Sequence, residues 1–220
     1  MPISDAALNL IIQEETGGND YYYKSGENRP SWPGGASGVT IGIGFDVGYA
    51  LASELADDWH GLISDDAISA LQSVVGIHGA AASSHADELH WIDIPWDAAM
   101  TVFTNRDIPK WTDQCTTDLP NFNDLNGDCQ GALVSLAYNR GPSWNIPAEK
   151  DPSGRYREMR AIKWFMSTKQ FDQIPGQFLS MRRLWPIDGD LWKRRMHEAA
   201  LFQQGLNSGT TSTPTQEVTS

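Results

Sequence analysis

The sequence predicts an α+β fold that is predominantly helical. Apolar residues recur at helical spacing through most of the chain, whereas one short stretch, from Val39 to Asp46, alternates apolar and polar residues. A period of about 3.6 residues is typical of amphipathic helices, and a period of two is typical of a half-buried strand. A chain of 220 residues is also long enough to bury a substantial core in one or two domains.

The alternating stretch has one apolar and one polar face. Its apolar positions are Val39, Ile41, Ile43 and Phe45, and its polar face carries Thr40, Gly42, Gly44 and Asp46. Glycine weakens a strand and often marks a place where a ligand or another backbone comes close. Two interpretations follow. The polar face is the floor of a cleft, or the glycines serve the turn of an ordinary hairpin.

The first helix is predicted over residues 4–15 and ends in two glutamates. Its apolar stripe consists of Leu8, Ile11 and Ile12. The next position on this stripe is Glu15, and Glu14 lies about 100° around the helix from it. A carboxyl group at the end of an apolar stripe is partly removed from water, which favours the protonated form that a general acid needs. Glu15 is therefore the candidate acid, and the alternative is a helix-end glutamate that turns into water.

The remaining elements follow from apolar spacing and from capping residues. Further helices are predicted over residues 47–56, 65–75, 95–111, 129–138, 155–166 and 191–204. Tyr21–Tyr23 is expected to open an extended segment, and Asp128 to cap the helix that begins at Cys129. The last helix is expected to carry Arg194, Arg195 and His197 on its polar side. After Gly205 the composition changes to small and polar residues, so we expect one domain over 1–205 and a disordered tail or linker stub over 206–220.

The charge pattern excludes several classes of protein. The net charge of -12 argues against nucleic acid as the main partner, because phosphate binding requires a basic face. The stretch from Arg155 to Glu198 is nevertheless locally basic, with ten Lys or Arg against five Asp or Glu. The sequence shows no apolar run long enough to cross a bilayer, and its N-terminus lacks a basic segment followed by an apolar one. We therefore expect neither stable membrane insertion nor a secretory signal.

Cysteine and histidine patterns indicate structural roles. Cys115 and Cys129 are too few for a disulfide framework and do not fit a zinc pattern. Two alternatives remain for them, a single disulfide bridge or two buried free thiols. His85 and His90 are five residues apart, which does not place them on one helix face as in H-E-x-x-H. We expect no metal and no cofactor.

Three segments, in this order, resemble the phage-type lysozymes of glycoside hydrolase family 24. They are the helix ending in Glu15 followed by Thr40-Ile41-Gly42-Ile43-Gly44, the run Ala132-Leu133-Val134-Ser135-Leu136-Ala137-Tyr138-Asn139-Arg140-Gly141, and the run Arg194-Arg195-Met196-His197-Glu198-Ala199-Ala200-Leu201-Phe202. The resemblance covers residues 4–205. It implies a lysozyme-like fold with a small β-hairpin lobe and a larger helical lobe.

The resemblance also implies a muramidase that hydrolyses the β-1,4 bond between N-acetylmuramic acid and N-acetylglucosamine. Glu15 would be the general acid and Thr40 would position a water. The usual phage enzymes carry their catalytic Asp earlier in the chain, near Tyr23 in this sequence, where no carboxylate stands. The pesticin-like branch carries it six residues after the Thr, and Asp46 occupies that position. The substrate-binding residues implied are Gly42, Gly44, Tyr22, Trp32, Asn139 and Arg140.

Two other functions are weighed against the muramidase. One is a chitinase- or chitosanase-like glycosidase of the lysozyme superfamily, for which the net charge of -12 suits cationic chitosan. The other is a glycan-binding module without catalytic activity. As a muramidase, the protein is expected to be a monomer made in the cytoplasm. It would act on the cell wall of a target bacterium as a phage endolysin or a delivered toxin, with an immunity protein as partner if it is a toxin.

Overall fold

The structure is a computed structural model, and it describes residues 3–209. The fold is predominantly helical with a small two-stranded antiparallel sheet. The chain forms two compact units. Ile12–Pro109 forms one, which we call the hairpin unit, and the residues up to Ile11 together with those from Lys110 onward form the other, the helical unit.

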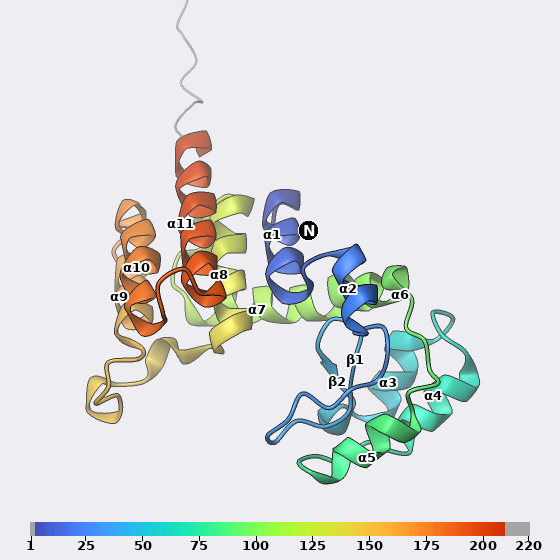
Figure 1. Cartoon of the computed structure of the whole chain (residues 1–220). Coiled ribbons are helices and arrows are strands. Elements are labelled where there is room, and N and C mark those ends of the chain that lie inside the picture. Colours follow the sequence, from blue (N-terminus) through green and yellow to red (C-terminus); the bar gives the residue numbers. More distant parts are fainter. Residues whose placement is uncertain (1–2, 210–220) are drawn as a thin grey trace, which may run out of the picture. The chain divides into compact units, whose positions relative to one another are not determined.

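The hairpin unit contains the strands and most of the shorter helices (Figure 1). Its elements are the end of α1 (Asp5–Thr16), α2 (Asn19–Ser25), β1 (Thr40–Ile41), β2 (Phe45–Asp46), a 3-10 turn η1 (Val47–Tyr49), α3 (Ala52–Trp59), α4 (Asp65–Gln72), α5 (Ala81–Glu88), α6 (Trp96–Val102) and a π-helical turn η2 (Phe103–Asp107). Ser64 caps α4, because its hydroxyl accepts a hydrogen bond from the Ala67 amide at 3.2 Å.

The alternating stretch is a hairpin rather than one continuous strand. Its apolar positions, from Val39 to Val47, are buried at every second residue, so the predicted alternation of burial is confirmed. The ring of Phe45 lies edge-on to Trp59, with centroids 5.6 Å apart, and the Arg106 guanidinium lies 4.5 Å from the Phe45 centroid. Arg106 comes from the π-helical turn and also pairs with Asp58 at 2.6 Å. These contacts fix β2 on the core of the unit.

Two predictions for the hairpin unit were wrong. Tyr21–Tyr23 lies in helix α2 and is not extended. In this helix Tyr22 is buried, and its hydroxyl donates to the Ile94 carbonyl. The helix predicted over residues 47–56 is broken, since the 3-10 turn ends at Tyr49 and α3 begins only at Ala52. Extended backbone at Ala50 and Leu51 separates the two.

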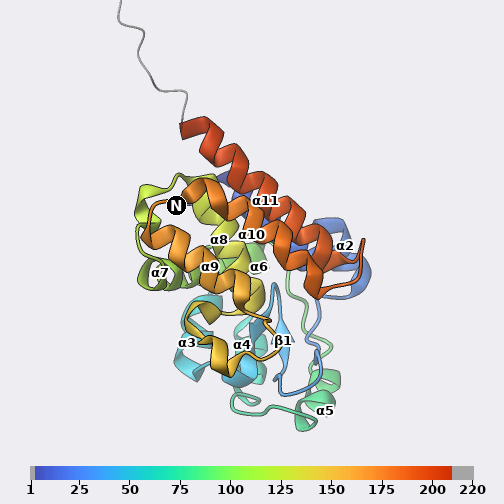
Figure 2. The ribbon, with the colours of Figure 1, turned by 90° about the vertical axis from the view of Figure 1, so that its left-hand side faces the viewer.

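The helical unit is built around α8 (Figures 1 and 2). Its other elements are the start of α1, α7 (Ile108–Asp118), α9 (Arg157–Ser167), α10 (Ile174–Met181), a 3-10 turn η7 (Arg182–Leu184) and α11 (Asp190–Gly209), and α8 itself spans Gly127–Arg140. Nine consecutive residues of α8, from Cys129 to Ala137, are buried. Helix α11 packs on both α8 and α10 and lies beside α10 in both views. The predicted central core helix is confirmed, but α10 was not predicted.

A buried ion cluster joins α8 to α11. The Glu198 carboxylate accepts hydrogen bonds from Arg195 at 2.8 Å and from Ser135 at 2.7 Å, and Arg194 donates to the same Oε1 atom at 3.3 Å. Both arginines are at most 2% exposed. The prediction that Arg194 and Arg195 lie on the polar side of the last helix was therefore wrong for these two residues. Each guanidinium is paired, which lowers the cost of its burial.

Smaller corrections concern a cap and a helix end, and the structure also decides between the two alternatives left open for the cysteines. Asn126, not Asp128, caps α8, because Asn126 Oδ1 accepts from the Cys129 amide at 3.1 Å. Helix α11 runs to Gly209, four residues past the predicted boundary of the tail, and the rest of that prediction lies outside the described residues. Cys115 and Cys129 are both free and buried. Within residues 3–209, none of the helices combines the length and apolarity needed to cross a bilayer.

Candidate active site

Thr40 and Asp46 are direct partners across the hairpin. Strands β1 and β2 pair with Thr40 opposite Asp46 and Ile41 opposite Phe45. Side chains that are directly opposite in an antiparallel pair point to the same face, with Cβ atoms about 4.5–5.5 Å apart. Both residues are half-buried. The hairpin thus brings a hydroxyl and a carboxylate together at the surface of the unit.

The Asp46 carboxylate is held by two backbone amides. The Gly38 N–H donates to Oδ1 and Oδ2, both at 3.1 Å, and the Gly48 N–H donates to Oδ1 at 3.0 Å. A Cβ on Gly38 would lie 2.5 Å from the Gly48 Cα, and one on Gly48 would lie 2.5 Å from the carbonyl oxygen of Ile77. Neighbouring backbone segments therefore approach Gly38 and Gly48 so closely that neither position has room for a side chain. Gly38 and Gly48 were not predicted as site residues, although in the sequence they flank the stretch from Thr40 to Asp46 on either side.

Gly42 and Gly44 form the turn of the hairpin. Both have positive φ, 56° and 75°, a conformation that residues with a Cβ rarely adopt. A Cβ on Gly42 would meet Trp59 at 3.0 Å and Ala99 at 3.3 Å, so that side of the turn is filled by protein. Gly42 and Gly44 therefore serve the turn of the hairpin and do not form the floor of a cleft.

A short loop segment, Ala36–Gly38, connects Asp46 with aromatic side chains. The Ala36 carbonyl accepts a hydrogen bond from the Tyr49 hydroxyl at 2.8 Å, and the Ser37 carbonyl accepts one from the Trp32 indole N–H at 3.0 Å. The next residue, Gly38, donates to Asp46. Trp32 is half-buried, and its polar atom is occupied, so only the ring surface is left to contact a ligand.

Glu15 lies one residue before the end of α1, and both Glu15 and Glu14 are half-buried. The buried residues of this helix include Ala7, Ile11, Ile12 and Thr16. At 100° per residue, Glu15 lies within about 10° of the centre of the arc that these four span, whereas Glu14 lies about 110° from it. The Thr16 hydroxyl donates to the Ile12 carbonyl at 2.9 Å and accepts from the Gly18 amide at 3.0 Å, which fixes the helix end. Glu15 belongs to the hairpin unit, as Thr40 and Asp46 do.

Tyr22 is a core residue and does not fit the predicted contact with substrate. Its side chain is fully buried, and its hydroxyl donates to the Ile94 carbonyl at 3.1 Å. Burial, with a smaller contribution from Tyr23, raises the pKa of the Tyr22 hydroxyl. A sugar ring has no Tyr22 surface on which to stack.

Asn139 and Arg140 belong to the helical unit and make contacts within it, although the Nε and Nη1 atoms of Arg140 are buried without a hydrogen-bond partner among the described residues. Asn139 Oδ1 accepts from Arg195 at 3.3 Å. Arg140 donates to the Arg155 carbonyl at 2.8 Å, and its guanidinium lies over the ring of Trp185, 5.2 Å from the centroid. Burial, together with the charge of Arg155, lowers the pKa of Arg140 to about 10.

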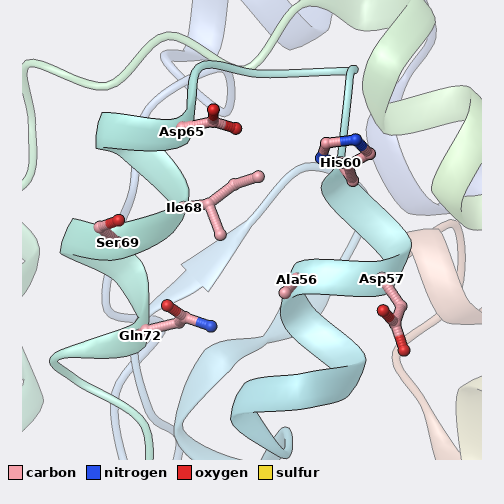
Figure 3. Close-up of a pocket in the computed structure, with 7 residues that line it drawn as sticks. All are labelled: Ala56, Asp57, His60, Asp65, Ile68, Ser69 and Gln72. Carbon is pink, nitrogen blue, oxygen red and sulfur yellow. The ribbon is translucent and has the colours of Figure 1, made fainter.

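A surface pocket lies between α3 and α4 and contains none of the predicted site residues (Figure 3). Its volume is about 430 Å³, and it is lined by Ala56, Asp57, His60, Asp65, Ile68, Ser69 and Gln72. Figure 3 shows Ile68 pointing from α4 into the space between the helices. Within residues 3–209, no group of three His, Cys, Asp or Glu side chains is arranged to hold a metal ion.

Comparisons with known proteins add no information on the site. No family model matches the sequence, and a search of curated proteins finds no significant match. The function therefore has to be argued from the residues and their arrangement.

Proposed function

We propose that this protein is a glycoside hydrolase of the lysozyme type, a muramidase that cleaves the β-1,4 bond between N-acetylmuramic acid and N-acetylglucosamine in peptidoglycan. The observation that carries the proposal is the pairing of Thr40 with Asp46 across the hairpin, with the carboxylate held by two backbone amides. A second carboxyl, Glu15, is half-buried and lies one residue before the end of α1, in the part of this helix that belongs to the same compact unit.

The proposed mechanism divides the chemistry between two carboxyl groups, as glycosidases generally do. Glu15 protonates the glycosidic oxygen as the bond breaks. Asp46 faces the developing positive charge of the sugar and either stabilises it or activates a water for attack. Thr40, directly opposite Asp46, holds that water through its hydroxyl. No cofactor is required for this reaction.

The proposed setting follows from the substrate. The protein would be a monomer that acts in the periplasm or on the wall of a target bacterium, as an endolysin after phage infection or as a toxin delivered by a secretion system. In the second case an immunity protein would protect the producing cell. These proposals rest on the resemblance to the phage-type lysozymes.

Digestion of purified sacculi, with mass analysis of the soluble fragments, tests the proposal. A muramidase releases disaccharide fragments with N-acetylmuramic acid at the new reducing end. Glu15→Gln is the control, because an amide of the same size cannot donate an acidic proton. Fragments cut at the other glycosidic bond or in the peptide, or no fragments, would overturn the proposal.

A second candidate function is hydrolysis of chitosan, and the distribution of charge favours it. The hairpin unit carries 3 Lys or Arg against 15 Asp or Glu, a net charge of -12, whereas the helical unit is balanced, with 13 of each kind. The whole net charge thus lies in the unit that holds the candidate site. Turnover of purified chitosan in place of sacculi would establish this alternative, and binding of glycans without turnover of either would establish a binding module.

A further inference from the structure

Two exposed rings stack on each other near the candidate site. Tyr49 ends the 3-10 turn η1, and His78 follows α4; their ring centroids are 4.6 Å apart, with an interplanar angle of 6°. Tyr49 is 62% exposed, and His78 is exposed as well. The rings are parallel and offset, so each covers part of one face of the other, and the pair forms a small aromatic surface on the hairpin unit. We call it the Tyr49–His78 plate.

The plate is attached to the same backbone that holds Asp46. Gly38, which donates to both carboxylate oxygens, pairs with His78 in an antiparallel bridge. Gly48, the other donor, directly precedes Tyr49, and its carbonyl accepts from the Gly76 amide at 3.0 Å. The plate and the carboxylate therefore share two anchors, and neither can shift without moving the other.

The plate is also fixed in orientation and offers mainly ring surface. The Tyr49 hydroxyl is used by the Ala36 carbonyl at 2.8 Å, and the Ser37 carbonyl accepts from the Gly79 amide, next to His78, at 3.0 Å. A side chain that is already ordered loses less entropy when a ligand binds to it. In the part of the chain that the structure describes, no ion pair involves His78.

Flat aromatic surface of this kind suits a pyranose ring. The face of an aromatic ring carries partial negative charge, and the axial C–H groups of a β-linked sugar carry partial positive charge. Stacking of this type needs neither a charged ligand nor a hydrogen-bonding side chain. It therefore suits a glycan strand even beside an acidic unit, where anionic groups are repelled.

From these contacts we infer that the Tyr49–His78 plate is a binding subsite on which an N-acetylated sugar ring of the substrate stacks, adjacent to the sugar that Asp46 faces. The inference rests on the proposed function, because it places the plate beside a glycosidase site. It adds residues that the sequence analysis did not select and assigns them recognition by ring contact rather than catalysis.

The experiment measures binding separately from cleavage. Glu15→Gln serves as the parent, and the probe is the soluble β-1,4-linked tetramer of N-acetylglucosamine, with Kd determined by calorimetry or NMR titration. Tyr49→Ala in the parent removes the plate, Tyr49→Phe keeps the ring and removes its hydrogen bond to Ala36, and Trp91→Ala removes another exposed aromatic (57% exposed) from the same unit. The amide resonances of Gly38 and Gly48 report whether Asp46 is still held.

The expected result is that Tyr49→Ala weakens binding by about three- to tenfold, while Tyr49→Phe and Trp91→Ala stay close to the parent. The Gly38 and Gly48 amides should keep their protection from hydrogen exchange in all three variants. Unchanged affinity in Tyr49→Ala, or no binding by the parent, overturns the subsite. It is also overturned if Tyr49→Phe loses as much affinity as Tyr49→Ala, or if the loss comes with lost protection of the Gly38 and Gly48 amides, because the tyrosine then only holds the loop.

Failure of the proposed function has a different signature. If wild-type protein releases nothing from sacculi or chitosan, yet the tetramer binds and Tyr49→Ala weakens that binding, the plate is a glycan-binding site without hydrolysis. If wild-type protein cleaves sacculi and Tyr49→Ala leaves KM unchanged, the enzyme is established and the subsite is overturned.

Discussion

At the scale of single residues, Asp46 carries both a structural and a proposed chemical role. Its carboxylate accepts from the Gly38 and Gly48 amides and so closes the loop beside the hairpin. A substitution that destroys both roles would leave the cause of lost activity ambiguous. Asparagine is the informative replacement, because its amide oxygen can still accept from both glycines while the negative charge is lost.

We expect Asp46→Asn to reduce hydrolysis of sacculi by several orders of magnitude with little loss of stability. The control is Asp20→Asn, which removes a carboxylate from the first turn of α2 and should change the rate little. Initial rates and urea denaturation are measured for both. Equal rates for Asp46→Asn and wild type would remove Asp46 from the mechanism and leave it with the structural role alone.

The role of Asp46 also determines the stereochemistry of the product. If Asp46 activates a water held by Thr40, the first product has inverted configuration, as in enzymes whose carboxyl groups lie roughly 6.5–9.5 Å apart. We expect inversion, since Thr40 stands where it could hold such a water. NMR of the first-formed anomer decides the question, and a β-anomer appearing first would make Asp46 a nucleophile.

The two glutamates that end α1 should differ sharply in function. Glu15→Gln should lower kcat by about 10²- to 10⁴-fold, because the amide cannot donate an acidic proton. Glu14→Gln should retain most of the activity, since Glu14 lies away from the centre of the buried arc of the helix. Both variants are compared by kcat on sacculi. A larger loss in Glu14→Gln would show that the wrong glutamate has been chosen.

The sequence allowed some of these residues to be selected but not others. Thr40, Asp46 and Glu15 stand out against an apolar alternation or stripe, but the roles of Thr40 and Asp46 came from the resemblance to the phage-type lysozymes. Tyr22 was misassigned, because exposed and buried tyrosines look alike in a run of three. Tyr49 and His78 were missed, because their stacking depends on contacts between segments about 29 residues apart in the sequence, and no local pattern encodes these.

At the scale of elements, the periodicity of apolar residues predicted which residues of the hairpin are buried. It did not predict that the stretch is interrupted by a turn. The alternation from Val39 to Val47 survives a turn in its middle, because the two glycines reverse the chain without changing which face is buried. The burial of Arg194 and Arg195 in α11 was misjudged for a different reason. Arg194 and Arg195 follow the helical period, but their partners Ser135 and Glu198 turn a polar stripe into a buried cluster.

Glu158 joins three elements of the helical unit and should make stability depend on pH. Its buried carboxylate accepts from Ser180 of α10 at 3.1 Å and from Arg183 of η7 at 2.8 Å. Burial opposes ionisation of Glu158, but the hydrogen bonds from Arg183 and Arg157 outweigh it and lower its pKa. A carboxyl whose pKa is lowered by folding stabilises the folded state above its ordinary pKa, and that contribution is lost as the pH falls through the lowered value.

We therefore expect Glu158→Gln to lower the free energy of unfolding at pH 7 by about 1.5–3 kcal/mol. The difference from wild type should shrink as the pH falls through the lowered pKa of Glu158, because the wild-type carboxylate then becomes protonated. Urea denaturation at pH 7 and at a series of acidic pH values measures both effects, and Glu149→Gln, at an exposed position of the same unit, is the control. A difference that stays constant across this range contradicts the role of ionised Glu158.

At the scale of the whole molecule, the charge is divided between the units. The hairpin unit has the full net charge of -12, and the helical unit contains the basic stretch from Arg155 to Arg195. On anionic sacculi, moderate salt screens repulsion and attraction over about 10 Å. We expect a mild optimum in rate as salt is raised, because repulsion from the hairpin unit is relieved before attraction to the basic stretch is lost.

Rates on sacculi and on chitosan from 10 to 500 mM salt test this expectation. Chitosan is cationic, so its hydrolysis should fall from the lowest salt upward. A continuous decline on sacculi would mean that attraction dominates at every ionic strength, contrary to the division of charge.

The two buried cysteines of the helical unit can be used to measure how often this unit opens. Cys115 in α7 and Cys129 in α8 are buried, and their thiols donate to the carbonyls of Leu133 and Phe202. Burial, with a smaller contribution from neighbouring aspartates, raises the pKa of both, that of Cys129 to about 12, so the reactive thiolate is scarce in the folded state. A chromogenic disulfide reagent should label two thiols per chain rapidly in urea and the native protein far more slowly. Labelling of the native protein as fast as that in urea would contradict the burial of these residues, whereas slow labelling measures how often the unit opens, with no probe added to the chain.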